Sequence, residues 1–237
     1  MWLRVVPILI SDHALLRRAF CRFSIALAIA AVCGTDIAYA ERSGPDLLER
    51  GIRCEAENHF ACAKSLYDQA LRADPKLSEG IVGLGRLDFV AGRFDAAIAH
   101  FRRARILNSK APYPMIWLYL AELRAGKSAD TELRTGVEAG PTQEWPGPVI
   151  SFLLGSSRRD ELVEAALDAA PSIRDKARCE SNAYVGEYDL GLDDNKELAI
   201  SEFTAAVNTC GKTWPEGALA SVEARRLRAM GFRPSFD

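Results

Sequence analysis

The sequence is poor in the side chains that metal and acid–base chemistry need. It contains three histidines, and only His59 and His100 lie beyond the first forty residues. No H-x-x-x-H, H-E-x-x-H or C-x-x-C pattern occurs, so the spacings typical of zinc, thioredoxin-like and haem sites are missing. No serine stands in a G-x-S-x-G elbow. We therefore expect no catalytic centre, metal or cofactor, and we interpret His100 as a surface residue of a helix.

Long hydrophobic runs are also missing. The apolar run over residues 23–33 is well short of the ~20 residues that a membrane-spanning helix needs. A basic flank at 17–22 precedes it, and an A-x-A pattern ending at Ala40 follows it. This order predicts a secretory signal peptide over residues 1–40 and a mature domain over residues 41–237.

Two features of the predicted signal peptide leave alternatives open. Arg17-Arg18-Ala19-Phe20 resembles the R-R-x-F pattern of twin-arginine export, although an ordinary basic flank explains it as well. Cys33 is a candidate for lipidation, but Val32 stands where a lipobox needs a small residue. We expect a soluble periplasmic protein, with an outer-membrane lipoprotein as the alternative.

The sequence has no large excess of positive or negative charge that would favour binding to a charged polymer. Lys and Arg number 30 against 32 Asp and Glu, which gives a formal net charge of −2. Removal of residues 1–40 would take away four arginines and two aspartates and leave the remainder slightly more acidic. This balance argues against nucleic acid and anionic membrane surfaces as targets.

The most informative feature that the sequence does contain is a 34-residue repeat. Four small or aromatic positions recur: Gly51 with Gly85, Ala63 with Ala97, Tyr67 with Phe101 and Ala70 with Ala104. The small residues let two antiparallel helices approach closely, and the aromatic residue fills the gap between one helix pair and the next. Because each unit is too thin to bury its own apolar face, neighbouring units must stack. The repeat predicts an all-α solenoid of helical hairpins.

Turn residues divide the predicted domain. Pro75 ends the first unit, and Gly92 and Gly126 mark the hairpin turns of the next two. The predicted units are clear repeats over about 44–77 and 78–111, a degenerate repeat over 112–144, an irregular helical pair over 145–171, a last repeat-like hairpin over about 175–212 and a capping helix over 216–230. We expect the capping helix to present a polar outer face, as terminal repeats do.

The spacing of small residues, aromatic and proline resembles the tetratricopeptide repeat. Leu47 and Ile81 stand where that repeat commonly has a tryptophan. Three blocks, in order, also resemble the periplasmic lipoproteins of the NlpI type: Trp117 to Glu122, Trp145 with Ile150 to Gly155, and Tyr184 to Leu190. That resemblance implies a tetratricopeptide adaptor, commonly dimeric, that brings a tail-specific protease to peptidoglycan hydrolases. Val32 departs from the family's lipobox, which leaves membrane attachment and the set of partners open.

Four cysteines beyond residue 40 suit an oxidising compartment. Cys54 and Cys62 should face each other across the first hairpin turn. Cys179 and Cys210 should lie at helix ends that an antiparallel pair brings together. The spacing predicts the disulfides Cys54–Cys62 and Cys179–Cys210, with buried free thiols as the alternative.

Stacked hairpins line a concave surface with their first helices, and extended peptides commonly bind such a surface. Repeat geometry assigns ten positions to this groove: Leu48, Ile52, Val82, Arg86, Phe89, Val90, Tyr113, Ile116, Leu120 and Arg124. Arg86 and Arg124 would bracket an acidic or carboxylate-ended peptide. The alternative is that the apolar members are core between repeats and the arginines are ordinary surface charges.

These features favour a non-enzymatic periplasmic adaptor that binds other proteins or peptides, such as an envelope protease or a peptidoglycan hydrolase. A structural subunit of a larger export or envelope complex is the alternative. An enzyme is the third hypothesis, and no set of nucleophile, base and metal ligands in the sequence supports it.

Overall fold

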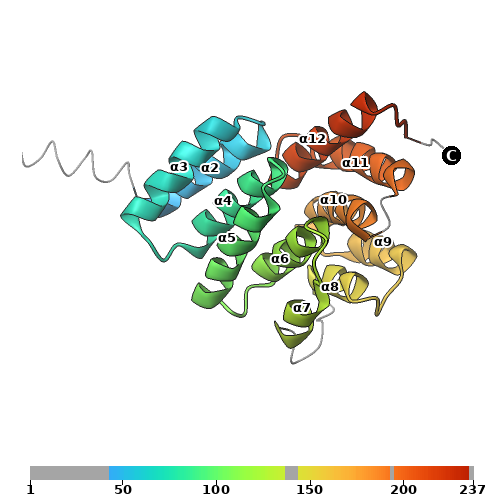
Figure 1. Ribbon diagram of the computed structural model, residues 1–237, viewed down its shortest axis with the longest axis horizontal. Helices are drawn as coiled ribbons and strands as arrows, with labels where there is room; N and C mark the ends of the chain where they lie inside the picture. Colours follow the sequence, from blue (N-terminus) through green and yellow to red (C-terminus); the bar gives the residue numbers. More distant parts are fainter. Residues whose placement is uncertain (1–42, 137–143, 193–194, 235–237) are drawn as a thin grey trace, which may run out of the picture. The chain divides into compact units, whose positions relative to one another are not determined.

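A computed structural model describes residues 43–136, 144–192 and 195–234. Within these ranges the chain forms eleven helices and no strand (Figure 1). The helices are α2 (Gly44–Ala56), α3 (Phe60–Ala73), α4 (Ser78–Val90), α5 (Phe94–Leu107), α6 (Pro112–Arg124), α7 (Asp130–Gly136), α8 (Gly147–Leu153), α9 (Arg159–Asp168), α10 (Arg174–Leu192), α11 (Lys196–Cys210) and α12 (Pro215–Ala229). The predicted signal peptide lies outside the described residues.

Consecutive helices pack against each other in antiparallel pairs, as the repeat predicts. The closest pairs are α2 with α3, α4 with α5, and α10 with α11, and each pair also packs against a helix next in the chain. Gly92 and Gly126 have φ angles of 74° and 67° at the ends of α4 and α6. Such positive angles are strained for other residues, which explains glycine at these turns. The fold is a helical-hairpin solenoid.

A glycine facing an aromatic ring closes each of the three clearest hairpins. A Cβ atom placed on Gly51, Gly85 or Gly186 would lie 2.5–2.7 Å from the ring of the aromatic residue on the second helix. These rings belong to Tyr67, Phe101 and Phe203 respectively, and all three are fully buried. The recurring aromatic therefore fills space inside its own hairpin.

The same rings also join neighbouring hairpins. Tyr67 lies against Gly83 of α4, where an added Cβ would come within 2.6 Å of the ring. Phe101 stacks on Trp117 of α6, with ring centroids 6.0 Å apart. The aromatic residue therefore packs between neighbouring helix pairs, as expected, and also fills space within its own pair.

We expect Gly85→Val to destabilise the protein by about 1–3 kcal/mol, because the Phe101 ring is held by Trp117 and cannot move away. Thermal unfolding measures this loss. Gly44→Ala is the control, since a Cβ there would meet its neighbours at 3.5 Å or more. Equal unfolding temperatures for Gly85→Val and the wild type would contradict this account of the repeat.

The segment after the second repeat is less regular. The predicted second helix of the degenerate repeat is the short α7, and its Leu133 is buried. The predicted irregular pair is α8 and α9, which pack on each other and against α10. These helices bridge the front hairpins and the last one.

The C-terminal helices do more than cap the stack. α12 packs against α11 as expected, but it also contacts α10 and the first helix of the domain, α2. α10 in turn packs along α6. One face of α12, including Leu219 and Val222, is therefore buried, while Arg225 and Arg228 on the other face are exposed. The helix predicted as a polar cap lies across the face formed by the first helices.

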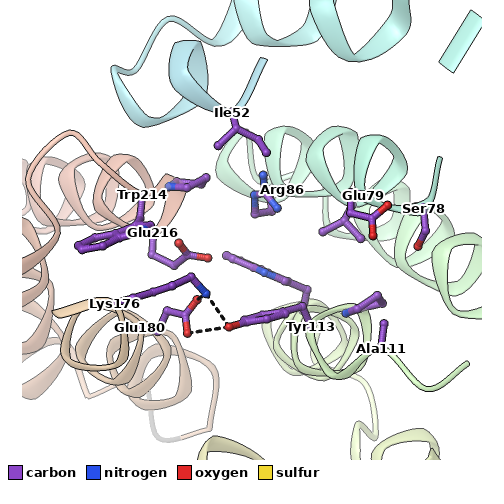
Figure 2. A pocket seen from close by; sticks show the side chains of 14 residues that line it. Ile52, Ser78, Glu79, Arg86, Ala111, Tyr113, Lys176, Glu180, Trp214 and Glu216 are labelled. Atoms are coloured by element: carbon purple, nitrogen blue, oxygen red, sulfur yellow. Dashed lines mark hydrogen bonds and ion pairs between the residues drawn. The ribbon is translucent and has the colours of Figure 1, made fainter. Parts of the chain in front are cut away.

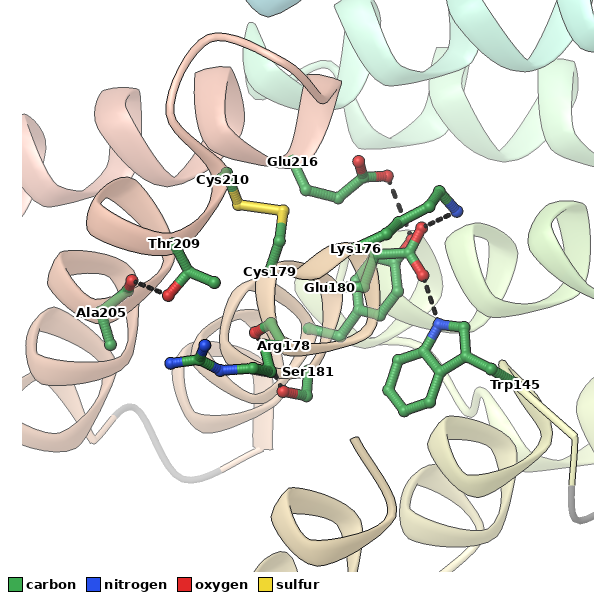
Figure 3. Close-up of a disulfide and its surroundings, with 11 residues drawn as sticks. Trp145, Lys176, Arg178, Cys179, Glu180, Ser181, Ala205, Thr209, Cys210 and Glu216 are labelled. Atoms are coloured by element: carbon green, nitrogen blue, oxygen red, sulfur yellow. Dashed lines mark hydrogen bonds and ion pairs between the residues drawn. A yellow bond between two sulfur atoms is a disulfide. The ribbon is translucent and has the colours of Figure 1, made fainter. Parts of the chain in front are cut away.

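The two predicted cysteine pairs lie at disulfide distance. Cys54 and Cys62 have Cα atoms 5.9 Å apart, across the turn between α2 and α3. Cys179 and Cys210 have Cα atoms 4.8 Å apart and join the start of α10 to the end of α11 (Figure 3). This arrangement is compatible with an oxidising compartment. None of the described helices is long and apolar enough to cross a bilayer.

Candidate functional site

Half of the predicted groove residues lie in the core. Val82, Phe89, Val90, Ile116 and Leu120 are buried in one cluster. That cluster also contains Tyr184 and Val185 from α10 and Leu219 and Val222 from α12. Because the C-terminal helices cover them, Phe89, Val90, Ile116 and Leu120 do not line the expected groove, whereas Val82 still lines a cavity described below. All five are core residues between repeats, which was the alternative for the apolar groove positions.

Arg124 is held inside the protein. Its guanidinium pairs with Glu187 of α10 and lies 3.9 Å from Glu223 of α12. It also lies 5.1 Å from the centroid of the Phe94 ring. Burial raises the pKa of Glu187 to about 8, with Arg124 opposing the rise and Glu223 adding to it. Arg124 therefore joins α6 to α10 and α12.

Arg86 also has an internal partner. It donates two hydrogen bonds to Glu55 of α2, at 2.8 and 2.6 Å, and Tyr67 donates another to the same carboxylate. The Glu55 side chain is only 2% exposed. Both arginines that the sequence assigns to a carboxylate-ended peptide thus already have carboxylate partners from the chain itself.

What remains of the expected groove is a cavity of about 260 Å³. It lies between α2, α4, α6, α10 and the start of α12, as Figure 2 shows. Its apolar wall consists of Ile52, Val82, Pro114, Trp117, Trp214 and Pro215, and its polar groups are those of Ser78, Glu79, Arg86, Tyr113, Lys176, Glu180 and Glu216. Of the ten predicted groove residues, Ile52, Val82, Arg86 and Tyr113 line this cavity. Leu48 is half-buried and lies beside it on α2.

Glu180 accepts three hydrogen bonds from side chains around the cavity. Its carboxylate accepts hydrogen bonds from Lys176 Nζ at 2.5 Å and Trp145 Nε1 at 2.6 Å (Figure 3), and from Tyr113 Oη at 3.2 Å (Figure 2). Burial and the nearby charge of Glu216 raise the pKa of Glu180 to about 7, against the opposing effect of Lys176. Lys176 also lies 4.4 Å from the centroid of the Tyr113 ring.

Glu216 differs from the buried Glu55, Glu180 and Glu187, because it has no cationic partner within ion-pair distance among the described residues. Glu79 also has none there, but it is exposed. It is 5% exposed, and Tyr184 donates one hydrogen bond to its Oε1 at 3.2 Å. Oε2 accepts none within that part of the chain. Pro215 at the first position of α12 fixes the start of the helix and so the direction of this side chain.

Buried carboxyl groups should make the protein more stable in mild acid. Glu180 and Glu187 hold their protons up to about pH 7 and 8 when folded, against an ordinary value of 4.5. Their contribution is therefore full below about pH 4.5 and is lost as the pH rises through 7 to 8. We expect the unfolding temperature to fall by several degrees between pH 5 and pH 8, on the order of 5 °C.

Calorimetry of Glu187→Gln tests this dependence, because the substitution removes one titrating group and should flatten the curve. Glu197→Gln, on the exposed first turn of α11, is the matched control and should leave the curve unchanged. A wild-type unfolding temperature that stays constant or rises between pH 5 and pH 8 would contradict the assignment.

The described residues hold no cluster of three or more His, Cys, Asp or Glu side chains that could bind a metal ion. The cavity combines an apolar wall and aromatic rings with charged groups. No known protein-family model matches the chain.

Proposed function

We propose that this chain is a non-enzymatic periplasmic adaptor that binds another protein through the cavity between α4, α6, α10 and α12. The observation that carries the proposal is the cavity itself, where side chains from separate hairpins converge on a partly open, mostly apolar space. A site of this kind accepts one anchoring side chain of a partner, and such anchors commonly dominate the binding energy.

The sequence and the cysteine pairs support the compartment. Residues 1–40 have the order of a secretory signal, and the two disulfide pairs suit an oxidising environment. The resemblance to NlpI-type lipoproteins supports a partner from the envelope, such as a tail-specific protease or a peptidoglycan hydrolase.

Affinity purification of the tagged protein from cell envelope tests the adaptor role. We expect an envelope protein to be retained by the wild type and lost by Trp214→Ala, which removes an aromatic wall of the cavity. Arg93→Ala is the control, because Arg93 lies exposed at the turn before α5. Retention of the protein alone, or of the same partner by both variants, would contradict binding at the cavity.

A second observation favours the structural-subunit alternative. Val163 and Leu167 stand one turn apart on α9 and are 42% and 49% exposed, so they form an apolar strip that a permanent neighbour would cover. A structural subunit would co-purify at a fixed ratio and would be released by Val163→Ser with Leu167→Ser. An adaptor would instead show partners at variable ratio.

A further inference from the structure

We propose that the cavity binds an alkylammonium group, either a lysine side chain of a partner or a free aliphatic amine. The proposal rests on the adaptor function only where the ammonium group comes from a lysine of a partner protein. It concerns Glu216, Trp117 and Trp214, none of which is among the ten predicted groove residues.

The charges around the cavity leave two carboxylates without a cation among the described residues, the exposed Glu79 and the buried Glu216. Arg86 is paired with Glu55, and Lys176 with Glu180, so these four charges balance in two close pairs. Glu216 is buried beside them with only the Tyr184 hydroxyl as a donor. Keeping a carboxylate out of water without a cation is costly. A ligand cation would supply the missing partner.

The direction of Glu216 makes it accessible to such a ligand. In Figure 2 its carboxylate points into the space that α4, α6 and α10 enclose, between Arg86 and Lys176. Its Oε2 accepts no hydrogen bond within the described chain, so one strong acceptor position faces the cavity. An ammonium group there would form a charge-assisted hydrogen bond.

The remaining wall suits the methylene chain and the charge of an alkylammonium ion. Ile52 and Val82 offer apolar contact, while Trp117, Trp214 and Tyr113 present aromatic rings. Cations are attracted to the faces of such rings. The volume of about 260 Å³ lies just below the roughly 300–1,000 Å³ of sites for drug-sized ligands. The space therefore suits one extended side chain or a small amine.

An anionic ligand fits the same space poorly. It would approach Glu216 without a compensating cation, and Arg86 or Lys176 would have to leave Glu55 or Glu180 to bind it. This reverses the expectation that the groove selects an acidic peptide. The two arginines that suggested an acidic peptide are held by internal carboxylates, and Glu216, a buried carboxylate without a cation, lies in the cavity.

Titration calorimetry on the purified protein tests the proposal with three probes of equal length: n-pentylammonium, n-pentanol and pentanoate. We expect measurable binding of the ammonium ion and at least tenfold weaker binding of the other two. Pentanoate that binds as tightly as pentylammonium would overturn the proposal, and so would tighter binding of pentanol. These comparisons use the wild type and need no variant to fold.

Glu216→Gln keeps the shape and the acceptor for Tyr184 but removes the charge, and it should weaken pentylammonium binding at least tenfold. Glu197→Gln on α11 is the control and should bind as the wild type does. Equal binding by wild type and Glu216→Gln, with both folded by circular dichroism, would overturn the assignment of Glu216.

A binding comparison with two peptides distinguishes the two sources of the ammonium group. An acetylated, amidated lysine peptide that binds more tightly than its norleucine analogue, and more tightly than pentylammonium, identifies a partner's lysine. Tighter binding of the free amine identifies a small-molecule ligand. Amine binding without any retained envelope protein would contradict the adaptor function and leave the cavity's specificity standing. A retained envelope protein without amine binding would contradict the proposed specificity of the cavity and leave the adaptor function standing.

Discussion

Above pH 8, where Glu187 is ionised, Arg124→Ala is expected to destabilise the protein by about 3–5 kcal/mol, the range for removing one partner of a buried ion pair. The Arg124 side chain is 15% exposed and pairs with Glu187, which is fully buried. Its loss would leave Glu187 without a cation between α6, α10 and α12, while the neighbouring Glu223 would keep its pair with Arg226. For a protein of this size the unfolding temperature should fall by about 10 °C.

Denaturant unfolding of Arg124→Ala, with two further variants, separates this mechanism from the loss of packing. Adding Glu187→Gln should restore part of the stability, because it removes the carboxylate left without a cation. Arg93→Ala removes a surface pair with Asp88 and should cost less than about 1 kcal/mol. A small effect of Arg124→Ala with lost partner binding would instead make Arg124 a binding residue, as the sequence suggested.

Removing the disulfide between Cys179 and Cys210 is the other change with a large expected effect. The bond spans 31 residues and joins the ends of the α10–α11 hairpin, so it restricts the unfolded chain strongly. We expect Cys179→Ser with Cys210→Ser to cost about 3–4 kcal/mol by chain-entropy estimates. Burial of both positions adds the cost of a polar hydroxyl in an apolar cluster.

The Cys54–Cys62 pair provides the comparison within the same chain. Its sequence separation is 8, and Cys62 is exposed, so its removal should cost about 2–3 kcal/mol. Thermal unfolding of the two double variants, with and without reductant, measures both values. Four free thiols in the native protein would rule out both bonds, and a larger loss from the shorter loop would contradict the ordering.

The sequence was sufficient for the hairpins because their packing is local. Gly85 and Phe101, or Gly186 and Phe203, must meet wherever two antiparallel helices are joined by a short turn. The same argument paired the cysteines across helix ends. Periodicity reports contacts inside a repeat and between neighbours, and those contacts make up the hairpins.

The covering of the concave face could not be read from periodicity, because it depends on helices far apart in the chain. Nothing in the repeat says that α12 returns to α2 or that α10 lies along α6. One signal was present. Lys176, Glu180, Tyr184 and Glu187 recur at helical spacing on α10 among small residues, a polar stripe on a helix that also carries buried Ala and Gly. We interpreted that stretch as the first helix of the last hairpin and, from Tyr184 to Leu190, as a resemblance block, although the stripe faces α6 and α12.

The site in the structure is therefore smaller and differently charged than the predicted groove. Peptide-binding solenoids that leave the concave face open contact several side chains of an extended ligand. Here the C-terminal helices occupy that face and leave room for one anchoring group. Specificity then depends on what Glu216 and the aromatic rings accept, and affinity for a protein partner needs further contacts around the opening.

Site-specific photo-crosslinking in intact envelope tests the central claim, that a partner binds at the cavity. A photoreactive amino acid replaces Glu79, which lines the cavity and is exposed, or Ala99, which is exposed on α5. The account predicts a cross-link to an envelope protein from position 79, abolished by Trp214→Ala, and none from position 99. A cross-link from position 99 alone, or one from position 79 that survives Trp214→Ala, would contradict it.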